Sequence, residues 1–244
     1  MTDVPFELRH EADVEGVVAA VFADIRRRMT FVPAIFKALA VDPEALERGW
    51  LQARGLFDHP GFADAAGRLR SLATPLSAPS GSPDFAKAVA PFVAELPGML
   101  LVVSSLGLAL DGRIPLRAPP PLGLSTADTP PEPIVPELHD HHPRYDDVRA
   151  LYGTAHVPTL YRALAAQGLL DAAWPFVEKV LGDESAAHRV ERLAVSGEDE
   201  AVNLTEWGCF DLQRMKPVLD QFRIALPRNL LVAVALGGAS SAPR

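Results

Sequence analysis

The stretch that decides the fold occurs twice in this chain, as VPAIFKALA at residues 32–40 and as VPTLYRALA at residues 157–165. The two copies align without a gap at an offset of 125 residues (157 − 32), and an aromatic residue, a basic residue and Ala-Leu-Ala occupy the same places in both. An Asp-apolar-Arg triplet precedes each copy, and a tryptophan follows each, at Trp50 and Trp174. We interpret this repetition as an internal duplication of one structural unit.

The apolar residues around the copies follow the spacing of amphipathic helices. Between residues 14 and 29 they recur at i, i+3, i+4 and i+7, which predicts a helix with one buried face. Asp42, Pro43 and Glu44 then supply an N-cap, a proline at the first helical position and an acid near the positive end of the helix dipole. Because the rest of the chain lacks strand patterns, the sequence favours an all-α fold.

A second set of matches lies later in each half, at a slightly larger constant offset. Five apolar residues recur there: Phe92 as Phe222, Leu96 as Leu226, Pro97 as Pro227, Leu100 as Leu230, and Leu101 as Leu231. We call this second alignment of the halves the later register. We expect a buried helix in each half, interrupted at each proline because proline has no N–H to donate within a helix. The apolar run from Met99 to Leu110 is shorter than the ~20 residues that span a bilayer, so no membrane segment is expected.

The stretch from residue 114 to residue 143 has a different composition and contains nine of the 23 prolines. Such a stretch is typical of a polyproline or irregular connection. We therefore expect two tandem helical repeats, residues 1–113 and 144–244, which form a pseudo-dimer and are joined by this Pro-rich crossing.

Composition narrows the class of protein and its partners. The net charge is −8 and the pI is about 5.4, and the only run of basic residues is at 26–28, so nucleic-acid and anionic-membrane partners are not expected. The single cysteine, Cys209, excludes an internal disulfide and a Cys-x-x-Cys site, and we interpret it as a buried small residue. The N-terminus has neither a basic region nor an apolar run, so we expect a cytoplasmic protein.

The motifs of residues 24–50, their second copy and the Pro-rich crossing together resemble the group I halocarboxylic acid dehalogenases, a family of 2-haloacid dehalogenases. The resemblance covers residues 12–240. It implies an all-α pseudo-dimer of tandem repeats with the active site enclosed between the halves. It also implies a hydrolytic displacement in which an aspartate activates a water that attacks C2 of a 2-haloacid, with no metal, no cofactor and no covalent ester.

The resemblance also implies where the catalytic groups would lie. The family's aspartate precedes the aromatic residue of the second copy, and that position is Leu160 in this chain. Leucine cannot accept a proton, so no catalytic residue is predicted there. The family's serine before the aspartate corresponds to Thr159, which keeps a hydroxyl.

Four further pocket positions follow from the same resemblance. The asparagine that helps to place the water corresponds to Leu96, and a pocket tyrosine corresponds to Met99. The aromatic pair on the halide side corresponds to Phe31 and Ala34. Polar and acidic roles are thus replaced by apolar side chains, and the predicted pocket is apolar.

Two functions therefore stay open. The first is the family's hydrolytic removal of halide from 2-halocarboxylic acids, impaired or altered in this chain. The second is a non-catalytic homologue with an apolar pocket between the repeats, either a small-ligand-binding protein or a structural one. The expected ligand is a small-molecule carboxylate or an apolar molecule, and a homodimer is a further alternative.

Three other polar features also have two interpretations each. The residues 139–142, His-Asp-His-His, look like metal ligands, but consecutive linker residues rarely converge on one ion, and no metal is expected. Lys37 and Arg162 occupy matched positions and either face an anionic ligand or are ion-paired at the surface. Asp146 and Asp147 are candidates to replace the missing base, but Asp147 is alternatively a structural acid that pairs with Arg149 or caps the helix.

Overall fold

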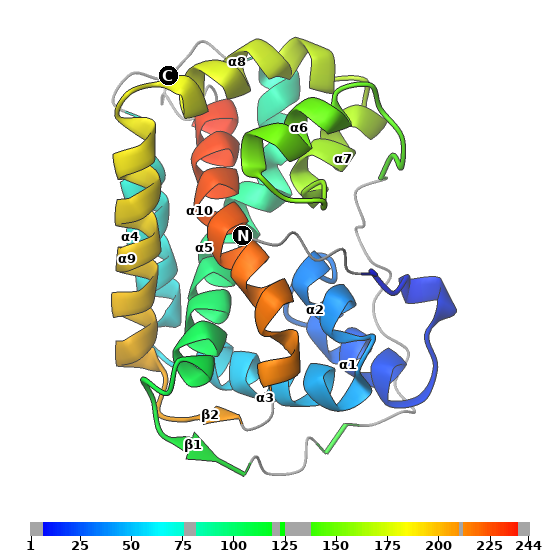
Figure 1. Cartoon of the computed structure of the whole chain (residues 1–244), viewed down its shortest axis with the longest axis vertical. Helices are drawn as coiled ribbons and strands as arrows, with labels where there is room; N and C mark the ends of the chain where they lie inside the picture. Colours follow the sequence, from blue (N-terminus) through cyan, green and yellow to red (C-terminus); the bar gives the residue numbers. More distant parts are fainter. Residues whose placement is uncertain (1–6, 76–81, 119–122, 125–137, 210–211, 239–244) are drawn as a thin grey trace.

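The structure is a computed structural model that describes residues 7–75, 82–118, 123–124, 138–209 and 212–238. Within these residues the chain forms ten α-helices, two short 3-10 helices and one pair of two-residue strands (Figure 1). The predicted all-α fold class is confirmed. Most of the predicted Pro-rich crossing, at 119–122 and 125–137, lies outside the described residues.

Of the described α-helices, five precede residues 114–143 and five follow them. The first half contains η1 (Glu11–Asp13), α1 (Gly16–Arg26), α2 (Ala34–Leu39), α3 (Pro43–Asp58), α4 (Phe62–Ala73) and α5 (Pro83–Leu110). The second half contains α6 (Tyr145–Tyr152), α7 (Thr159–Ala166), α8 (Leu170–Gly182), α9 (Ala186–Leu204), η2 (Gln213–Met215) and α10 (Lys216–Gly237). The repeated Val-Pro motifs lie directly before α2 and α7, where Pro33 and Pro158 are the N-caps.

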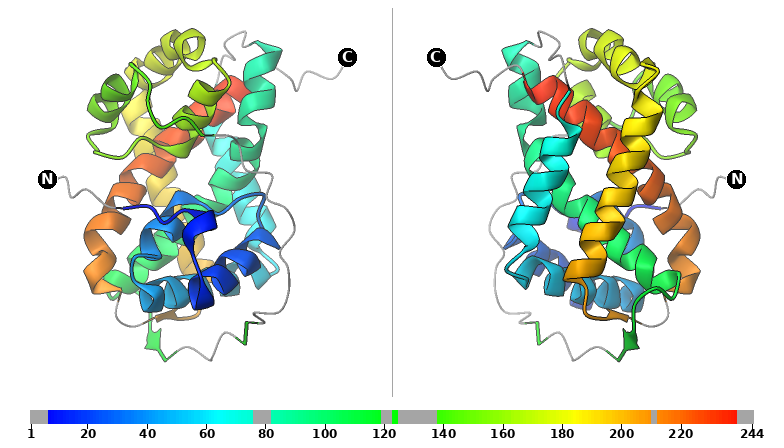
Figure 2. Two further views of the ribbon diagram at one scale, coloured as in Figure 1. Left: turned by 90° about the vertical axis from the view of Figure 1, so that its right-hand side faces the viewer. Right: turned by 90° about the vertical axis from the view of Figure 1, so that its left-hand side faces the viewer.

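The two long helices, α5 and α10, pack along each other through the middle of the molecule. Helices α1, α2 and α3 lie towards one end of this pair, α6, α7 and α8 towards the other, and α4 lies beside α9 (Figures 1 and 2). One hydrophobic cluster contains buried side chains from both halves. The short parallel pair of β1 (Leu116–Arg117) and β2 (Gly208–Cys209) joins the segments that follow α5 and α9.

The predicted interruptions at Pro97 and Pro227 are wrong, because both prolines lie inside continuous helices. Proline removes one intrahelical hydrogen bond and crowds the preceding turn, which destabilises an isolated helix. In this fold Pro97 and Pro227 are themselves buried, as are Leu96, Gly98 and Leu226, and α5 packs along α10. Tertiary packing therefore holds each helix together across its proline, and local sequence does not reveal that packing.

Among the described helices, α5 alone has the length and hydropathy that would suit a membrane span. It has 28 residues, more than the apolar run seen in the sequence, because the helix continues through Pro97. Of its most apolar window, 78% is buried inside the molecule. Neighbouring helices thus cover its apolar surface, as they do in the core helix of a globular protein.

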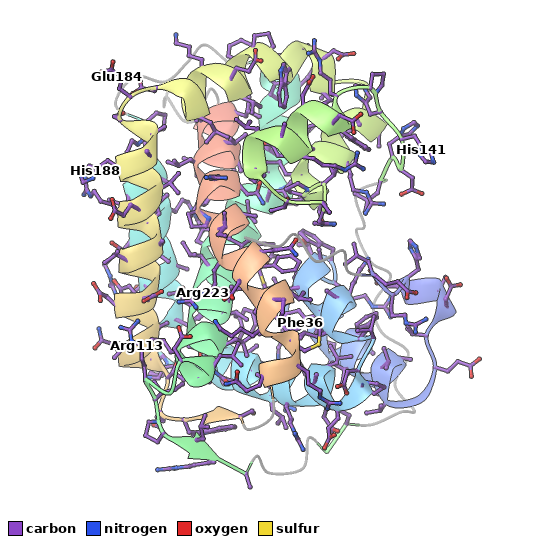
Figure 3. All side chains as sticks on the ribbon, viewed as in Figure 1. Phe36, Arg113, His141, Glu184, His188 and Arg223 are labelled. Atoms are coloured by element: carbon purple, nitrogen blue, oxygen red, sulfur yellow. The ribbon has the colours of Figure 1, made fainter. Side chains whose placement is uncertain are left out.

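The two tryptophans that follow the repeated motifs have different surroundings. Trp50 is fully buried, and its indole N–H donates a hydrogen bond of 2.8 Å to Asp24 Oδ2. The ring of Phe36, inside the molecule in Figure 3, meets the Trp50 ring edge-on at 5.3 Å. Trp174 instead lies beneath the Arg144 guanidinium, at 5.9 Å. Trp50 is therefore held by a buried hydrogen bond, whereas Trp174 contacts the cation of Arg144.

Asp147, the candidate substitute for the catalytic acid, has a structural role. Its carboxylate forms an ion pair of 3.2 Å with Arg144, and Asp146 pairs with Arg149 at 2.8 Å. The partner predicted for Asp147 is Arg149, but Asp147 pairs with Arg144, and Arg149 pairs with the neighbouring Asp146. Both carboxylates are exposed on α6 and neither lines the central cavity described below.

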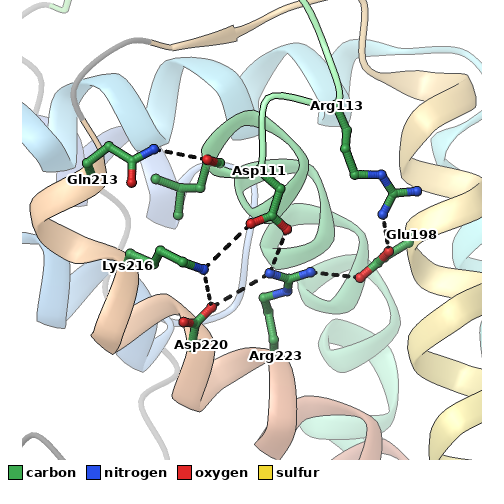
Figure 4. Close-up of polar contacts among 8 residues, drawn as sticks. Asp111, Arg113, Glu198, Gln213, Lys216, Asp220 and Arg223 are labelled. Carbon is green, nitrogen blue, oxygen red and sulfur yellow. Dashed lines mark hydrogen bonds and ion pairs between the residues drawn. The ribbon is translucent and has the colours of Figure 1, made fainter.

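A cluster of charged residues joins the C-terminal end of α5 to α9 and α10 (Figure 4). Arg223 on α10 pairs with Asp111 at 3.0 Å and with Glu198 at 2.8 Å. Glu198 on α9 also accepts a hydrogen bond from Arg113, at 2.5 Å. These contacts are partly buried, so water screens them less than it screens pairs on the open surface.

Replacing Glu198 with glutamine is expected to lower the free energy of unfolding by about 1–2 kcal/mol at neutral pH. Burial alone would raise the pKa of Glu198, but hydrogen bonds from Arg223 and Arg113 outweigh burial and lower it below the ordinary 4.5. An acid with a lowered folded pKa contributes stability that is present above its unfolded pKa and is lost as the pH falls through the folded pKa.

Urea denaturation of the wild type and of Glu198→Gln at about pH 7 and about pH 3 tests this expectation, because the stability difference should become smaller in acid. Glu191→Gln, an exposed position on the same helix, is the matched control and should change stability little. A Glu198→Gln effect of equal size at both pH values would contradict the electrostatic explanation.

Candidate functional site

A cavity of about 60 Å³ lies between α2 and α7 and against the middle of α5 and α10. The six pocket residues predicted from the sequence all line it: Phe31, Ala34, Leu96, Met99, Thr159 and Leu160. They come from segments far apart in the chain. The structure therefore brings every predicted site residue to one place.

The walls of the cavity are built almost entirely from matched positions of the two halves. At the offset that aligns the Val-Pro motifs (157 − 32), the pairs are Phe31 with His156, Pro33 with Pro158, Ala34 with Thr159, and Ile35 with Leu160. In the later register they are Phe92 with Phe222, Glu95 with Ala225, Leu96 with Leu226, and Met99 with Asn229. These eight pairs account for all lining residues except Thr154 and Gln221.

The matched walls differ in polarity. Three pairs are apolar in the first half and polar in the second: Phe31 with His156, Ala34 with Thr159, and Met99 with Asn229. Thr154 and Gln221, the unmatched polar residues, also belong to the second half. Apart from Glu95, the polar side chains that line the cavity therefore all come from the second half, and we call this wall the polar side.

His156 is a neutral group on this polar side. Burial lowers its pKa to about 4, and the positive charges of Arg162 and Arg149 act in the same direction. Its ring packs near that of Phe222, with 6.1 Å between the ring centroids. At neutral pH His156 therefore supplies no positive charge for an anion.

Leu160 has only 2% of its surface exposed and lies in the first turn of α7, against the cavity. No carboxylate occupies this wall among the described residues. Asn229 on α10 is 6% exposed, and its Oδ1 has no hydrogen-bond partner in the described part of the chain. Sequence reasoning missed Asn229, although the later register pairs it with Met99.

Glu95 is the one carboxylate among the described residues that line the cavity. It follows Phe92 by three positions and precedes Met99 by four, which places all three on one face of α5. Its Oε1 accepts hydrogen bonds from the backbone N–H of Thr30, at 3.1 Å, and from the Thr30 hydroxyl, at 3.2 Å. Sequence reasoning missed Glu95 as well, because a charged residue on a long apolar helix usually faces water.

No protein-family model matches this chain, and no curated protein matches it by sequence. Its structure does match solved structures. A D-2-haloacid dehalogenase mutant in complex with D-2-CPA matches with a TM-score of 0.73 and 14% identity, over 98% of this chain and 99% of that chain. The D-2-haloacid dehalogenase with L-LA matches with a TM-score of 0.72 and 12% identity, over the same shares of the two chains. This chain has the fold of a D-2-haloacid dehalogenase.

A second cavity, of about 170 Å³, adjoins the first and shares Phe31, Ala34 and Thr159 with it. The matched bases Lys37 and Arg162 both line this second cavity in the dehalogenase fold. Each base is held by an acid: Lys37 pairs with Glu11 at 2.8 Å, and Arg162 pairs with Asp140. Both bases are therefore ion-paired, but their side chains are only 15% and 14% exposed, so they do not lie at the surface as the second interpretation expected.

The remaining candidate groups lie away from the cavity. Among the described residues, no group of three or more His, Cys, Asp or Glu side chains is placed to hold a metal ion. Within the His-rich segment, His141 points away from the ribbon in Figure 3, and Asp140 is bound to Arg162. Burial raises the pKa of Cys209 to about 11, so at neutral pH it is a thiol and a poor nucleophile.

Proposed function

We propose that this chain uses the dehalogenase fold to bind a small molecule in the cavity between its halves, and that it does not hydrolyse 2-haloacids. The observation that supports this proposal best is the buried side chain of Leu160 on the cavity wall, where the family resemblance puts the base. Hydrolytic displacement needs a carboxylate within hydrogen-bond reach of the attacking water. Leucine removes that group.

The cavity is also poorly suited to a haloacid substrate. A 2-halocarboxylate is an anion, and a dry site needs a counter-charge or several hydrogen-bond donors to accept it. No Lys or Arg side chain lines this cavity among the described residues, and His156 is neutral. The nearby bases Lys37 and Arg162 are already paired with acids.

The size of the cavity limits the ligand. A space of about 60 Å³ holds roughly four to six waters, at 10–15 Å³ for each. A ligand of comparable size has only a few heavy atoms, unless side chains such as those of Phe31 or Met99 move. Small apolar molecules and short-chain compounds with one polar end fit this limit.

Glu95 supports a second candidate function, the hydrolysis of a carbon–halogen bond with a different base. Its carboxylate lines the cavity and is oriented through Oε1 by Thr30. A carboxylate held in this way at the edge of an apolar space is able to accept a proton from water. The second candidate thus relocates the base from α7 to α5.

Halide release separates the two candidates. Wild-type protein is expected to release no chloride or bromide above the blank from either enantiomer of 2-chloro- and 2-bromopropionate. The same assay with Glu95→Gln provides the matched control, because glutamine keeps the shape and removes the proton acceptor. Turnover in the wild type that is lost in Glu95→Gln would refute the binding proposal and establish the second candidate.

Xenon provides a direct test of the cavity, because it enters apolar cavities without needing a polar partner. Xenon-129 NMR is expected to show binding to the wild type and none to Ala34→Leu, in which added methyl groups fill the space. Ala166→Leu is the control, since Ala166 lies on α7 at a similar partial burial and does not line the cavity. Equal xenon binding by all three proteins would show that this cavity is not a binding site.

A further inference from the structure

We infer that the ligand of this cavity is a small neutral molecule that donates a hydrogen bond from N–H or O–H to Asn229, and that carboxylate anions are excluded. The inference rests on the proposed binding function and specifies the chemical class of the ligand. It follows from three features of the described cavity: the unpartnered side-chain oxygen of Asn229, the absence of a lining Lys or Arg, and the presence of one acid.

Asn229 is the unpartnered acceptor. It lines the cavity, is only 6% exposed, and its Oδ1 has no hydrogen-bond partner in the described part of the chain. A buried carbonyl oxygen without a donor destabilises a folded protein. Such a group is usually retained where something else completes its hydrogen bonding.

The fold itself does not require a polar side chain at this position. Asn229 follows Pro227 by two positions on α10, as Met99 follows Pro97 on α5. Met99 is 3% exposed and lines the same cavity with an apolar side chain. Because the matched position packs well without any hydrogen bond, the amide of Asn229 is explained better by a ligand than by packing.

The charges around the cavity select a neutral ligand. Among the described lining residues Glu95 is the one acidic side chain, no Lys or Arg is present, and His156 is neutral. A carboxylate bound here would lose its hydration, find no cation, and be repelled by Glu95. A neutral donor avoids all three costs.

The asparagine side chain also suits this class of ligand geometrically. Its amide presents an acceptor oxygen and a donor nitrogen in one plane, so a primary amide can pair with both, and an alcohol with one. Thr159, on the same polar side, adds a hydroxyl that both donates and accepts. The apolar end of the ligand then faces Phe31 and Met99.

Propionamide and propionate form a matched pair of test ligands, because they have nearly the same shape and differ in charge. Ligand-observed NMR titration of the wild type at neutral pH is expected to give a Kd for propionamide at least about tenfold below that for propionate. 1-Propanol is included to separate an N–H donor from an O–H donor. Propionate binding as tightly as propionamide would overturn the inference.

The variant that tests the residue is Asn229→Leu, which removes the polar atoms at nearly constant volume. The variant is expected to bind propionamide or 1-propanol about tenfold more weakly and to keep its xenon binding. Its Tm should be unchanged or raised, because an unpaired buried acceptor is lost. Asn203→Leu, on α9 and away from the cavity, is the control and should leave ligand affinity unchanged. A clear fall in Tm of Asn229→Leu would indicate a structural hydrogen bond and overturn the inference.

The two levels of the proposal fail differently. If xenon binds to the wild type and is blocked by Ala34→Leu, but neither the amide nor the alcohol binds, the cavity is a binding site and the assignment to Asn229 is wrong. If xenon also fails to bind, both the binding function and the ligand class are wrong.

Discussion

Replacing Leu160 with aspartate is expected to lower the free energy of unfolding by about 3 kcal/mol at neutral pH without producing dehalogenase activity. The substitution puts the family's catalytic acid back into a wall that has 2% exposure and no described cation beside it. It also removes the buried leucine contacts. Activity is not expected because Leu96 and Met99 still lack the polar groups that would orient a water. Urea denaturation and a halide-release assay with 2-chloropropionate measure the two effects.

Leu160→Asn is the control that separates charge from polarity, since it has the shape of aspartate and no ionisation. Burial raises the folded pKa of an introduced aspartate, so the folded state binds more protons than the unfolded state. The stability of Leu160→Asp should therefore rise as the pH falls towards the ordinary range of a carboxyl group, whereas that of Leu160→Asn should not follow this change. Full halide release by the single variant would show that the losses at Leu96 and Met99 matter less than proposed.

Trp50→Phe is expected to lower the free energy of unfolding by about 2–3 kcal/mol, and Trp174→Phe by about 1 kcal/mol. Both substitutions remove the same volume from matched positions. Only the first removes a buried hydrogen bond, the one of 2.8 Å from Trp50 to Asp24, and leaves a carboxylate that is 8% exposed with one donor fewer. Urea denaturation of the two variants under identical conditions measures the difference between their free energies of unfolding.

A double-mutant cycle between Trp50→Phe and Asp24→Ala assigns that difference to the hydrogen bond. The two substitutions together should cost less than the sum of their separate effects, because each removes the same contact. Arg27 and Arg54 lie near the Asp24 carboxylate, at 3.5 and 3.7 Å, and stay in place in every variant. Equal destabilisation by Trp50→Phe and Trp174→Phe would contradict the importance given to this contact.

The sequence predicted the all-α fold because helical periodicity and N-capping residues are local signals. The six pocket residues were implied by the family resemblance, and the structure places them around one cavity. The helix interruptions at Pro97 and Pro227 were predicted wrongly, because the packing of α5 against α10 is not local. A proline inside a helix has a similar free-energy cost wherever it occurs, but the burial that offsets this cost depends on the partner helix.

Glu95 and Asn229 show the other limit of prediction. Each is a polar residue on a long apolar helix, and only the folded structure shows that its side of the helix meets a cavity rather than water or a neighbouring helix. Extending the later register to every position between Phe92 and Met99 would have found both, since each is paired with an apolar residue. Matched positions of opposite polarity are therefore a useful signal within a repeated sequence.

The unequal walls of the cavity have a consequence for how a bound molecule is oriented. If matched positions had kept the same side chains, a ligand could enter in two equivalent poses related by the exchange of the halves. Because methionine is matched with asparagine and alanine with threonine, those poses would differ in energy, and one pose would be favoured. Substitutions on the first-half wall would then alter how large a guest is admitted, while those on the second-half wall would alter which end of the guest is recognised. Size and polarity can therefore change independently in this chain.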